Sequence, residues 1–185
     1  MPPPTLETDR LLLRPFFEED AEAFFRLNSD PDVLRYTGDP GVKTIEEARI
    51  GLLTRPIADY ATYGFGRLAC ILKQNGQLIG FAGLKRLEDL NEVDVGYRLL
   101  PPYWGVGLAT EAARAVVDQG FRHLGLDKII GLVDPEHVRS IRVLAKLGMT
   151  FDRLLEYRSD LVARYAVEKD SFLRTSTSQM GQRVE

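Results

Sequence analysis

Cysteine and histidine are scarce in this chain, which limits the chemistry it can perform. Among 185 residues there is one cysteine, Cys70, and there are two histidines. A lone cysteine excludes an internal disulfide, and these few sulfur and imidazole groups lack the spacing of zinc ligands, so no metal is expected. Cys70 lies in an apolar stretch and is expected to be a small buried residue of a cytoplasmic protein.

Long apolar runs and a strong net charge are also lacking. No run approaches the roughly 20 apolar residues that cross a bilayer, and the segment Met1–Pro4 does not resemble a signal peptide. A net charge of -3 argues against nucleic-acid binding as the main activity. With 44% hydrophobic and 28% charged residues, the composition predicts one globular domain with neither a membrane nor a nucleic acid as partner.

Hydrophobic periodicity predicts both helices and strands along the chain. Helices are expected over residues 18–28, 44–60, 109–124 and 138–147, and strands over 11–14, 65–72, 77–84, 92–99, 128–133, 149–157 and 161–168. Asn75-Gly76 predicts a tight hairpin. We therefore expect one α/β domain at residues 1–174, with a mixed, mostly antiparallel central sheet of about seven strands flanked by helices. Residues 175–185 are polar and are predicted to form a disordered tail.

The segment Tyr103–Ala112 reads Y-W-G-V-G-L-A-T-E-A and carries the clearest functional signal. Gly105 and Gly107 stand directly before a strongly helical run, where backbone N–H groups and the helix dipole can hold a phosphate or pyrophosphate. No Lys-Ser/Thr pair follows the glycines, so the phosphate loop of nucleotidases is a poor match. A dinucleotide fingerprint also fits poorly, because Thr110 stands where a third small residue is needed and Pro101-Pro102 precede the loop.

Five separated segments follow one another in an order that matches a known family. They are Leu6–Pro15, Leu78–Gly80, Asp94–Tyr97, Tyr103–Ala112 and Ser140–Met149. This set resembles the GNAT superfamily of acyl-CoA-dependent N-acetyltransferases, most closely the branch typified by ribosomal-protein-alanine acetyltransferases. The resemblance covers nearly the whole chain, and it implies the GNAT fold, with acetyl-CoA as the acetyl donor and a primary amine as the acceptor.

The resemblance also implies which residues bind CoA. Nine positions are expected to contact it: Leu99, Gly105, Val106, Gly107, Leu108, Ala109, Thr110, His137 and Ser140. An N–H group near Leu99, on a strand that splays from its neighbour, would polarise the thioester carbonyl. Two positions depart from the family pattern, since Val106 replaces a basic or polar residue and His137 replaces an asparagine.

Four residues are candidates for the catalytic steps. Glu92 and Asp94 alternate with apolar residues and share one side of their strand, and the resemblance places an acidic residue, commonly Glu, at Asp94. Either could accept the ammonium proton, Asp94 through an ordered water, unless both form a solvent-facing surface. Asp134, at the end of the next strand, is a third carboxylate for this role. Ser140 would serve the departing thiolate, unless it only caps its helix.

The resulting prediction is an N-acetyltransferase that moves acetyl from acetyl-CoA to a primary amine by direct attack in a ternary complex. The acceptor could be a protein N-terminus or a small-molecule amine, bound beneath a loop at Asp30–Thr44, and the protein could be a monomer or a homodimer. Two alternatives stay open: a non-catalytic CoA-binding regulatory module and a dinucleotide-binding protein.

Overall fold

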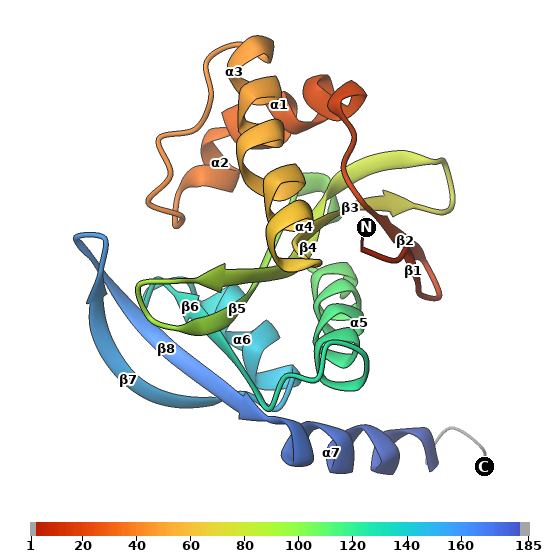
Figure 1. The fold of residues 1–185 in the computed structure, drawn as a ribbon, viewed down its shortest axis with the longest axis vertical. Coiled ribbons are helices and arrows are strands. Elements are labelled where there is room, and N and C mark those ends of the chain that lie inside the picture. The colour runs from red at the N-terminus through yellow and green to blue at the C-terminus, as the bar shows by residue number, and fades with distance from the viewer. Residues whose placement is uncertain (1–2, 182–185) are drawn as a thin grey trace.

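A single mixed sheet organises residues 3–181, which are the residues that the computed structural model describes (Figure 1). Its eight strands lie in the order β1-β2-β3-β4-β5-β6-β8-β7. Their bounds are β1 (Leu6–Glu7), β2 (Leu11–Arg14), β3 (Arg67–Leu72), β4 (Gln77–Leu87), β5 (Glu92–Leu99), β6 (Lys128–Val133), β7 (Thr150–Tyr157) and β8 (Asp160–Glu168). All neighbours are antiparallel except β5 and β6, which run parallel. The predicted α/β sheet is confirmed, and the additional strand is β1, which is too short to give a periodic signal.

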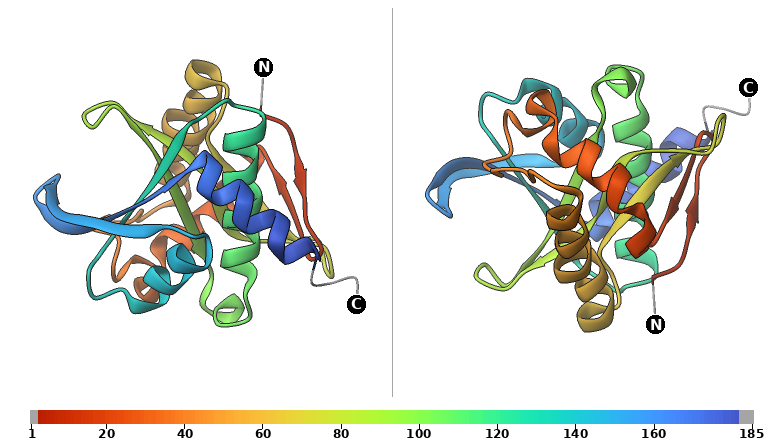
Figure 2. Two further views of the ribbon diagram at one scale, coloured as in Figure 1. Left: turned by 90° about the horizontal axis from the view of Figure 1, so that it is seen from below. Right: turned by 90° about the horizontal axis from the view of Figure 1, so that it is seen from above.

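Helices cover both faces of this sheet (Figure 2). They are α1 (Ala21–Ser29), α2 (Pro31–Leu34), α3 (Ile45–Leu52), α4 (Ala58–Tyr63), α5 (Leu108–Arg122), α6 (Val138–Lys146) and α7 (Lys169–Gly181). On one face Phe24 of α1 and Leu52 of α3 pack with Phe81 of β4. On the other, the apolar stripe of α5 packs against Val93 and Val95 of β5. The residues of β5 therefore point alternately toward the α1–α3 face and the α5 face.

The helix expected over residues 44–60 forms in three parts. Thr44 caps α3 by accepting a hydrogen bond from the Glu47 N–H at 3.1 Å, and Glu47 in turn accepts from the Lys43 N–H at 2.7 Å. A π-helical turn over Leu53–Ile57 separates α3 from α4 and contains Pro56. Proline has no N–H and its ring displaces the preceding carbonyl, which accounts for the local change of winding.

The predicted hairpin forms between β3 and β4, where Gly76 takes a φ of +70° and Asn75 accepts a hydrogen bond from the Gln77 N–H. The expected tail differs from the structure, because α7 continues to Gly181 and is anchored at its start by Phe172, which packs on Phe121 of α5. Residues 182–185 lie outside the described residues. Within residues 3–181, none of the helices has the length and apolar character that crossing a membrane requires.

Candidate active site

The two parallel strands part shortly after they begin. Asp94 of β5 stands opposite Ile130 of β6, and this is the one pair of the described residues that joins them. Further along, the Leu132 N–H donates to Asp94 Oδ1 at 2.9 Å in place of a backbone carbonyl of β5. The Asp94 side chain thus takes the place of a backbone acceptor in the β5–β6 ladder. The two strands diverge beyond it, as the family resemblance implies.

Leu99 lies on the edge of β5 that borders this gap. The following residue, Leu100, donates its N–H to Ile79 of β4 at 2.9 Å. Because backbone groups alternate in direction along a strand, the N–H of Leu99 turns away from β4 and toward the gap. Its carbonyl accepts from Trp104 Nε1 at 2.6 Å, which gives Trp104 a structural role. The assignment of the Leu99 N–H to a thioester carbonyl stays a prediction.

The glycine loop ends at the start of α5. Gly105 and Gly107 have φ angles of +78° and +86°, which favour glycine, and a Cβ added at Gly105 would meet no atom within 4 Å. Gly107 is the residue that precedes α5, and no side chain caps the helix. The first N–H groups of a 15-residue helix are thus free to bind an anion, which fits a pyrophosphate.

The other predicted loop residues act through different atoms. Val106 is 56% exposed, whereas Leu108 is buried in the core and offers the site only its backbone groups. Ala109 and Thr110 belong to the first turn of α5 and are half-buried.

An ion pair that the sequence did not suggest holds this loop. Arg10 donates from Nη1 to the Val106 carbonyl at 2.9 Å and from Nε to Glu111 Oε2 at 2.7 Å. Glu111 also accepts from Thr8 Oγ1 at 2.6 Å and from the Arg10 N–H at 2.8 Å. The turn between β1 and β2 is thereby attached to the loop and to α5. Because 101 residues separate Arg10 from Glu111, no local pattern could have revealed the pair.

Asp94 is nearly enclosed at the point where the strands part. Its residue is 8% exposed, on the α1–α3 face. Burial raises the pKa of Asp94 to about 6, although the Leu132 N–H and the nearby charges of Arg67 and Lys85 act in the opposite direction. Within the described part of the chain, its second oxygen, Oδ2, has no hydrogen-bond partner. A carboxyl group with a pKa near neutrality and a free oxygen is suited to accept a proton.

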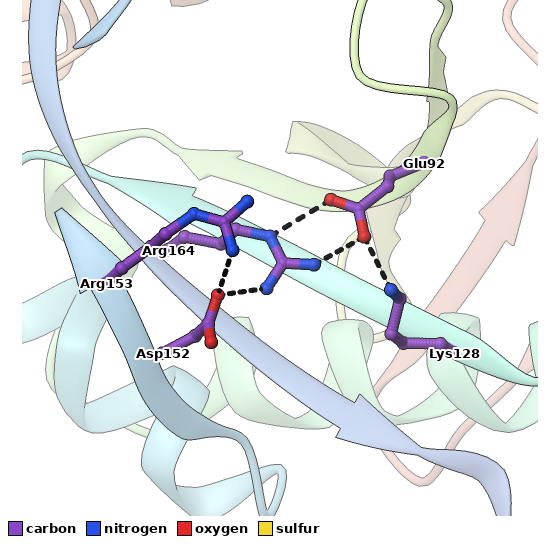
Figure 3. Close-up of polar contacts among 5 residues, drawn as sticks. All are labelled: Glu92, Lys128, Asp152, Arg153 and Arg164. Atoms are coloured by element: carbon purple, nitrogen blue, oxygen red, sulfur yellow. Dashed lines mark hydrogen bonds and ion pairs between the residues drawn. The ribbon is translucent and has the colours of Figure 1, made fainter. Parts of the chain in front are cut away.

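Glu92 lies on the same side of β5 but in different surroundings (Figure 3). It accepts from Arg164 Nε at 3.0 Å and from Lys128 Nζ at 2.7 Å, and Arg164 also donates to Asp152 at 2.5 Å. We call Glu92, Lys128, Asp152 and Arg164 the Glu92 network. Burial would raise the pKa of Glu92, but the hydrogen bonds from Arg164 and Lys128 outweigh it and lower the pKa.

Ser140 and Tyr97 meet on the α5 face of the sheet. The Tyr97 hydroxyl lies 2.9 Å from Ser140 Oγ and donates to the Ser140 carbonyl at 3.0 Å. Burial raises the pKa of Tyr97. No side chain caps α6, so the capping role considered for Ser140 is not seen. The structure instead gives this hydroxyl a phenol partner beside the gap.

His137 is in contact with the segment Asp30–Thr44. Its ring stacks on Tyr36 with centroids 4.5 Å apart and planes at 15°, and burial lowers the pKa of His137. A Cβ added at Gly38, in the same loop, would collide with Asp160, the first residue of β8. Residues 35–44 therefore extend from α2 across to the starts of α6 and β8. Asp134 accepts from the Glu136 N–H at 2.7 Å and so shapes the turn after β6.

Two buried arginines on the α1–α3 face were also missed. Arg98 follows Asp94 and Gly96 by strand alternation, so its direction could have been predicted. Arg67 of β3 packs across Gly96, where an added Cβ would lie 3.3 Å from its Nε and Nη2 atoms. This proximity depends on three strands meeting in register, which a single sequence does not reveal.

Comparisons with known proteins agree with this geometry. The profile of the acetyltransferase (GNAT) domain family matches residues 10–150. The uncharacterized N-acetyltransferase YoaA of Bacillus subtilis is 35% identical over 153 residues, which are 82% of this chain and 86% of that protein. Spermidine N(1)-acetyltransferase of Escherichia coli is 29% identical over 157 residues, covering 83% of this chain and 80% of that protein.

A solved structure shares the fold at low sequence identity. It is RimL, a ribosomal L7/L12 alpha-N-protein acetyltransferase in complex with coenzyme A, with a TM-score of 0.78 and 16% identity over 91% of this chain and 99% of that chain. The family match extends from Arg10, which holds the glycine loop, past α6. This chain belongs to the GNAT family of acetyltransferases and is an acetyl-CoA-dependent N-acetyltransferase.

Proposed function

We propose that this enzyme transfers the acetyl group directly to a primary amine while both substrates are bound, with Asp94 as the proton acceptor. The observation that carries the proposal is the position of Asp94. Its carboxyl group lies where β5 and β6 part, with Oδ1 held by the Leu132 N–H and Oδ2 without a partner in the described residues. A group fixed by one oxygen presents the other in a defined direction.

The arrangement around the gap supports a ternary complex. The free N–H groups at the start of α5 lie on one side of the sheet, and residues 35–44 extend over the other. A donor held at the α5 side and an acceptor held at the α1–α3 side can therefore reach the gap at the same time. Such a site requires no acetylated enzyme residue, and buried Cys70, whose pKa is raised by burial, is unsuited to being one.

Acetyl-CoA supplies a thioester, whose C–S bond breaks as the amine nitrogen bonds to the acetyl carbon. The amine first loses a proton, which Asp94 accepts directly or through one water. The Leu99 N–H is placed to donate to the carbonyl oxygen as negative charge develops there. Ser140, with Tyr97 behind it, is placed to donate a hydrogen bond to the departing sulfur. After attack the nitrogen loses a second proton, and the departing thiolate takes up one, so CoA leaves as the thiol. The proton on Asp94 passes to solvent and is the net proton released.

We assign the proton to Asp94 rather than to Glu92 because of their partners. Glu92 is held by two cations that lower its pKa, which weakens it as a base. Its contacts join β5 to β6 and β8, so it contributes to the site by fixing the strands where they still run together.

Turnover of acetyl-CoA against a panel of amines tests the proposal. Thiol release that depends on the amine, with the acetylated amine identified by mass, is the expected result. Calorimetric titrations with CoA and with NAD accompany it as binding controls. Tight CoA binding without amine-dependent thiol release would instead identify a regulatory CoA-binding protein, and binding of NAD but not CoA would identify a dinucleotide site.

A further inference from the structure

A pocket on the α1–α3 face of the sheet gathers positive charge beside the proposed acceptor site. It is lined by three phenylalanines, Phe16, Phe24 and Phe81, and by three arginines, Arg55, Arg67 and Arg98, with Asp39 and Asn28 among them. We call the three arginines and Asp39 the arginine pocket. The arginines come from separate segments, the π-helical turn, β3 and β5, so the cluster exists only in the folded chain.

Arg67 lies on β3 and Arg98 on β5, the two strands that flank β4, and both contact Phe81 of β4. Their guanidinium carbons are 4.9 and 5.5 Å from the centre of the Phe81 ring. The Nε of Arg67 is buried and has no hydrogen-bond partner. Arg98, whose side chain is 12% exposed, donates to Asn28 Oδ1. Burial, with the charge of Arg67 next, lowers the pKa of Arg98 to about 10.

One carboxylate within the pocket faces these three cations. Asp39 Oδ2 is 3.6 Å from Arg98 Nη1 and 3.7 Å from Arg55 Nη1, both longer than a hydrogen bond. Asp59 and Asp94 act on Arg67 only from a distance, since neither forms an ion pair with it in the described residues. Asp39 is thus the one carboxylate of the described residues within ion-pair distance of these arginines. The buried Nε of Arg67 still lacks a partner, whereas buried charged groups are normally paired.

We propose that the arginine pocket binds a carboxylate of the acceptor, so that the substrate is a small amine that also carries a negative charge. The inference rests on the proposed function and names its substrate class. A carboxylate accepts paired hydrogen bonds from guanidinium groups. A polyamine would bring further positive charge to the arginines and be repelled.

The spacing along β5 gives the length of this acceptor. Arg67 packs over Gly96, which is two residues from Asp94. Two residues of a strand span roughly 7 Å. An acceptor that reaches both groups therefore separates its amine from its carboxylate by several carbon atoms, as an ω-amino acid or a dipeptide does, whereas an α-amino acid is too short.

Binding, measured independently of turnover, is the first test. An ω-amino acid, the alkylamine of the same length and the matching diamine are each titrated calorimetrically into the enzyme saturated with CoA. The ω-amino acid is expected to bind tightest and the diamine weakest. If the alkylamine binds as tightly as the ω-amino acid, the inference is overturned whether or not any amine is acetylated.

Two substitutions with opposite expected effects on affinity then test the pocket itself. Arg98→Gln should weaken binding of the ω-amino acid roughly ten- to a hundredfold, as loss of one charge-assisted hydrogen bond predicts. Asp39→Asn removes the carboxylate that competes for the arginines and should tighten it. Arg55→Gln, at a side chain that is 53% exposed, should have a smaller effect and serves if Arg98→Gln fails to fold.

Arg26→Gln is the matched control, because Arg26 is an exposed arginine of α1 that pairs only with Glu22. It should leave all affinities unchanged. If Arg26→Gln and Arg55→Gln change the affinity equally, the effect reflects the overall charge of the protein, and a specific pocket is refuted. Carboxylate binding that responds to these substitutions, without acetylation of any amine, would keep the pocket and reject the proposed function.

Discussion

The start of β5 and the rest of that strand differ in how their charges are compensated. At the start, the Glu92 network places two carboxylates among cations at 3.0 Å or less, and Arg164 is 7% exposed. The hydrogen bonding that Arg164 donates to Glu92 is the main reason that the pKa of Arg164 is raised. Further along, Asp94 lacks an ion-pair partner among the described residues, and the arginine pocket holds one carboxylate for three arginines. Burial raises the pKa of Asp94 and lowers that of Arg98, which favours the neutral form of each.

This difference separates a structural from a functional use of charge. A balanced, hydrogen-bonded network links β5, β6, β7 and β8 at the start of β5. The unbalanced stretch lies at the gap, where each buried charge costs stability unless a substrate compensates it. The two parts of β5 thus differ in use: the charges at its start stabilise the fold, and those further along are the ones that we propose a ligand compensates.

Replacing Asp94 should give the largest effect. Asp94→Asn keeps an oxygen for the Leu132 N–H but cannot accept a proton, so kcat/KM at neutral pH should fall by roughly 10² to 10⁴. The wild-type rate should rise as pH passes through about 6, where Asp94 ionises, and the variant should lack that step. Rate–pH profiles of the two proteins provide the measurement.

Glu92→Gln is the control for that experiment. It should preserve the step near the pKa of Asp94 even if the network loosens and the rate falls. Neutral-pH activity retained by both variants would remove the carboxylates of β5 from proton transfer.

Breaking the network should give the next largest effect, on stability. Arg164→Gln leaves Glu92 and Asp152 without their shared partner, and loss of one member of a buried ion pair costs about 3 to 5 kcal/mol. Arg98→Gln should cost less, about 1 kcal/mol or below, because it relieves repulsion from Arg67 while losing a hydrogen bond to Asn28. Urea unfolding at neutral pH measures both, and equal losses would contradict the distinction between the two regions.

The buried carboxyl group should itself destabilise the fold at neutral pH. The folded-state pKa of Asp94 is raised from 3.8 to about 6, so its favourable contribution is complete below pH 3.8 and is lost as pH rises through 6. Asn never ionises, and Asp94→Asn should therefore be more stable than wild type by roughly 1 to 3 kcal/mol above pH 7. The difference should disappear near pH 4 in thermal unfolding. A gain of the same size at both pH values would point to packing rather than charge.

The smallest effect is expected on the opposite face of β5, at Ser140. Ser140→Ala should lower kcat by about tenfold, the cost of a hydrogen bond to the leaving sulfur, with little change in CoA affinity. Because Ser140 does not cap α6, the melting temperature should hardly change. Tyr97→Phe, which removes the hydroxyl behind Ser140, should show part of the same loss. An unchanged kcat in Ser140→Ala would take the serine out of the reaction.

Local signals predicted most of the fold. The range 92–99 was predicted residue by residue for β5, because alternating apolar and polar side chains specify a strand without tertiary information. Asn75-Gly76 and Thr44–Glu47 likewise act within a few residues. The strand β1 and the extension of α7 were missed, since two residues carry no period and the anchoring contact of Phe172 is with a distant helix.

The site was predictable where a motif is continuous in sequence. Gly105 and Gly107 predict an anion-binding loop before α5, which stays a prediction, and alternation places Glu92 and Asp94 on one face. The sequence could not show how the surroundings of Glu92 and Asp94 differ. Arg164, which engages Glu92, lies 72 residues away, and the enclosure that raises the pKa of Asp94 depends on strands and helices from several parts of the chain. For the same reason the arginine pocket was not foreseen.

The attachment of Arg10 to Val106 and Glu111 has a consequence for proteolysis. The turn that carries Arg10 is an exposed link between two short strands, the kind of segment that proteases cut first. Cleavage there would leave the cores on both faces of the sheet intact while releasing the glycine loop, the proposed site for the donor. Binding of the acetyl donor should protect this turn from proteases. Resistance to limited digestion near the N-terminus should therefore report whether the CoA site is occupied.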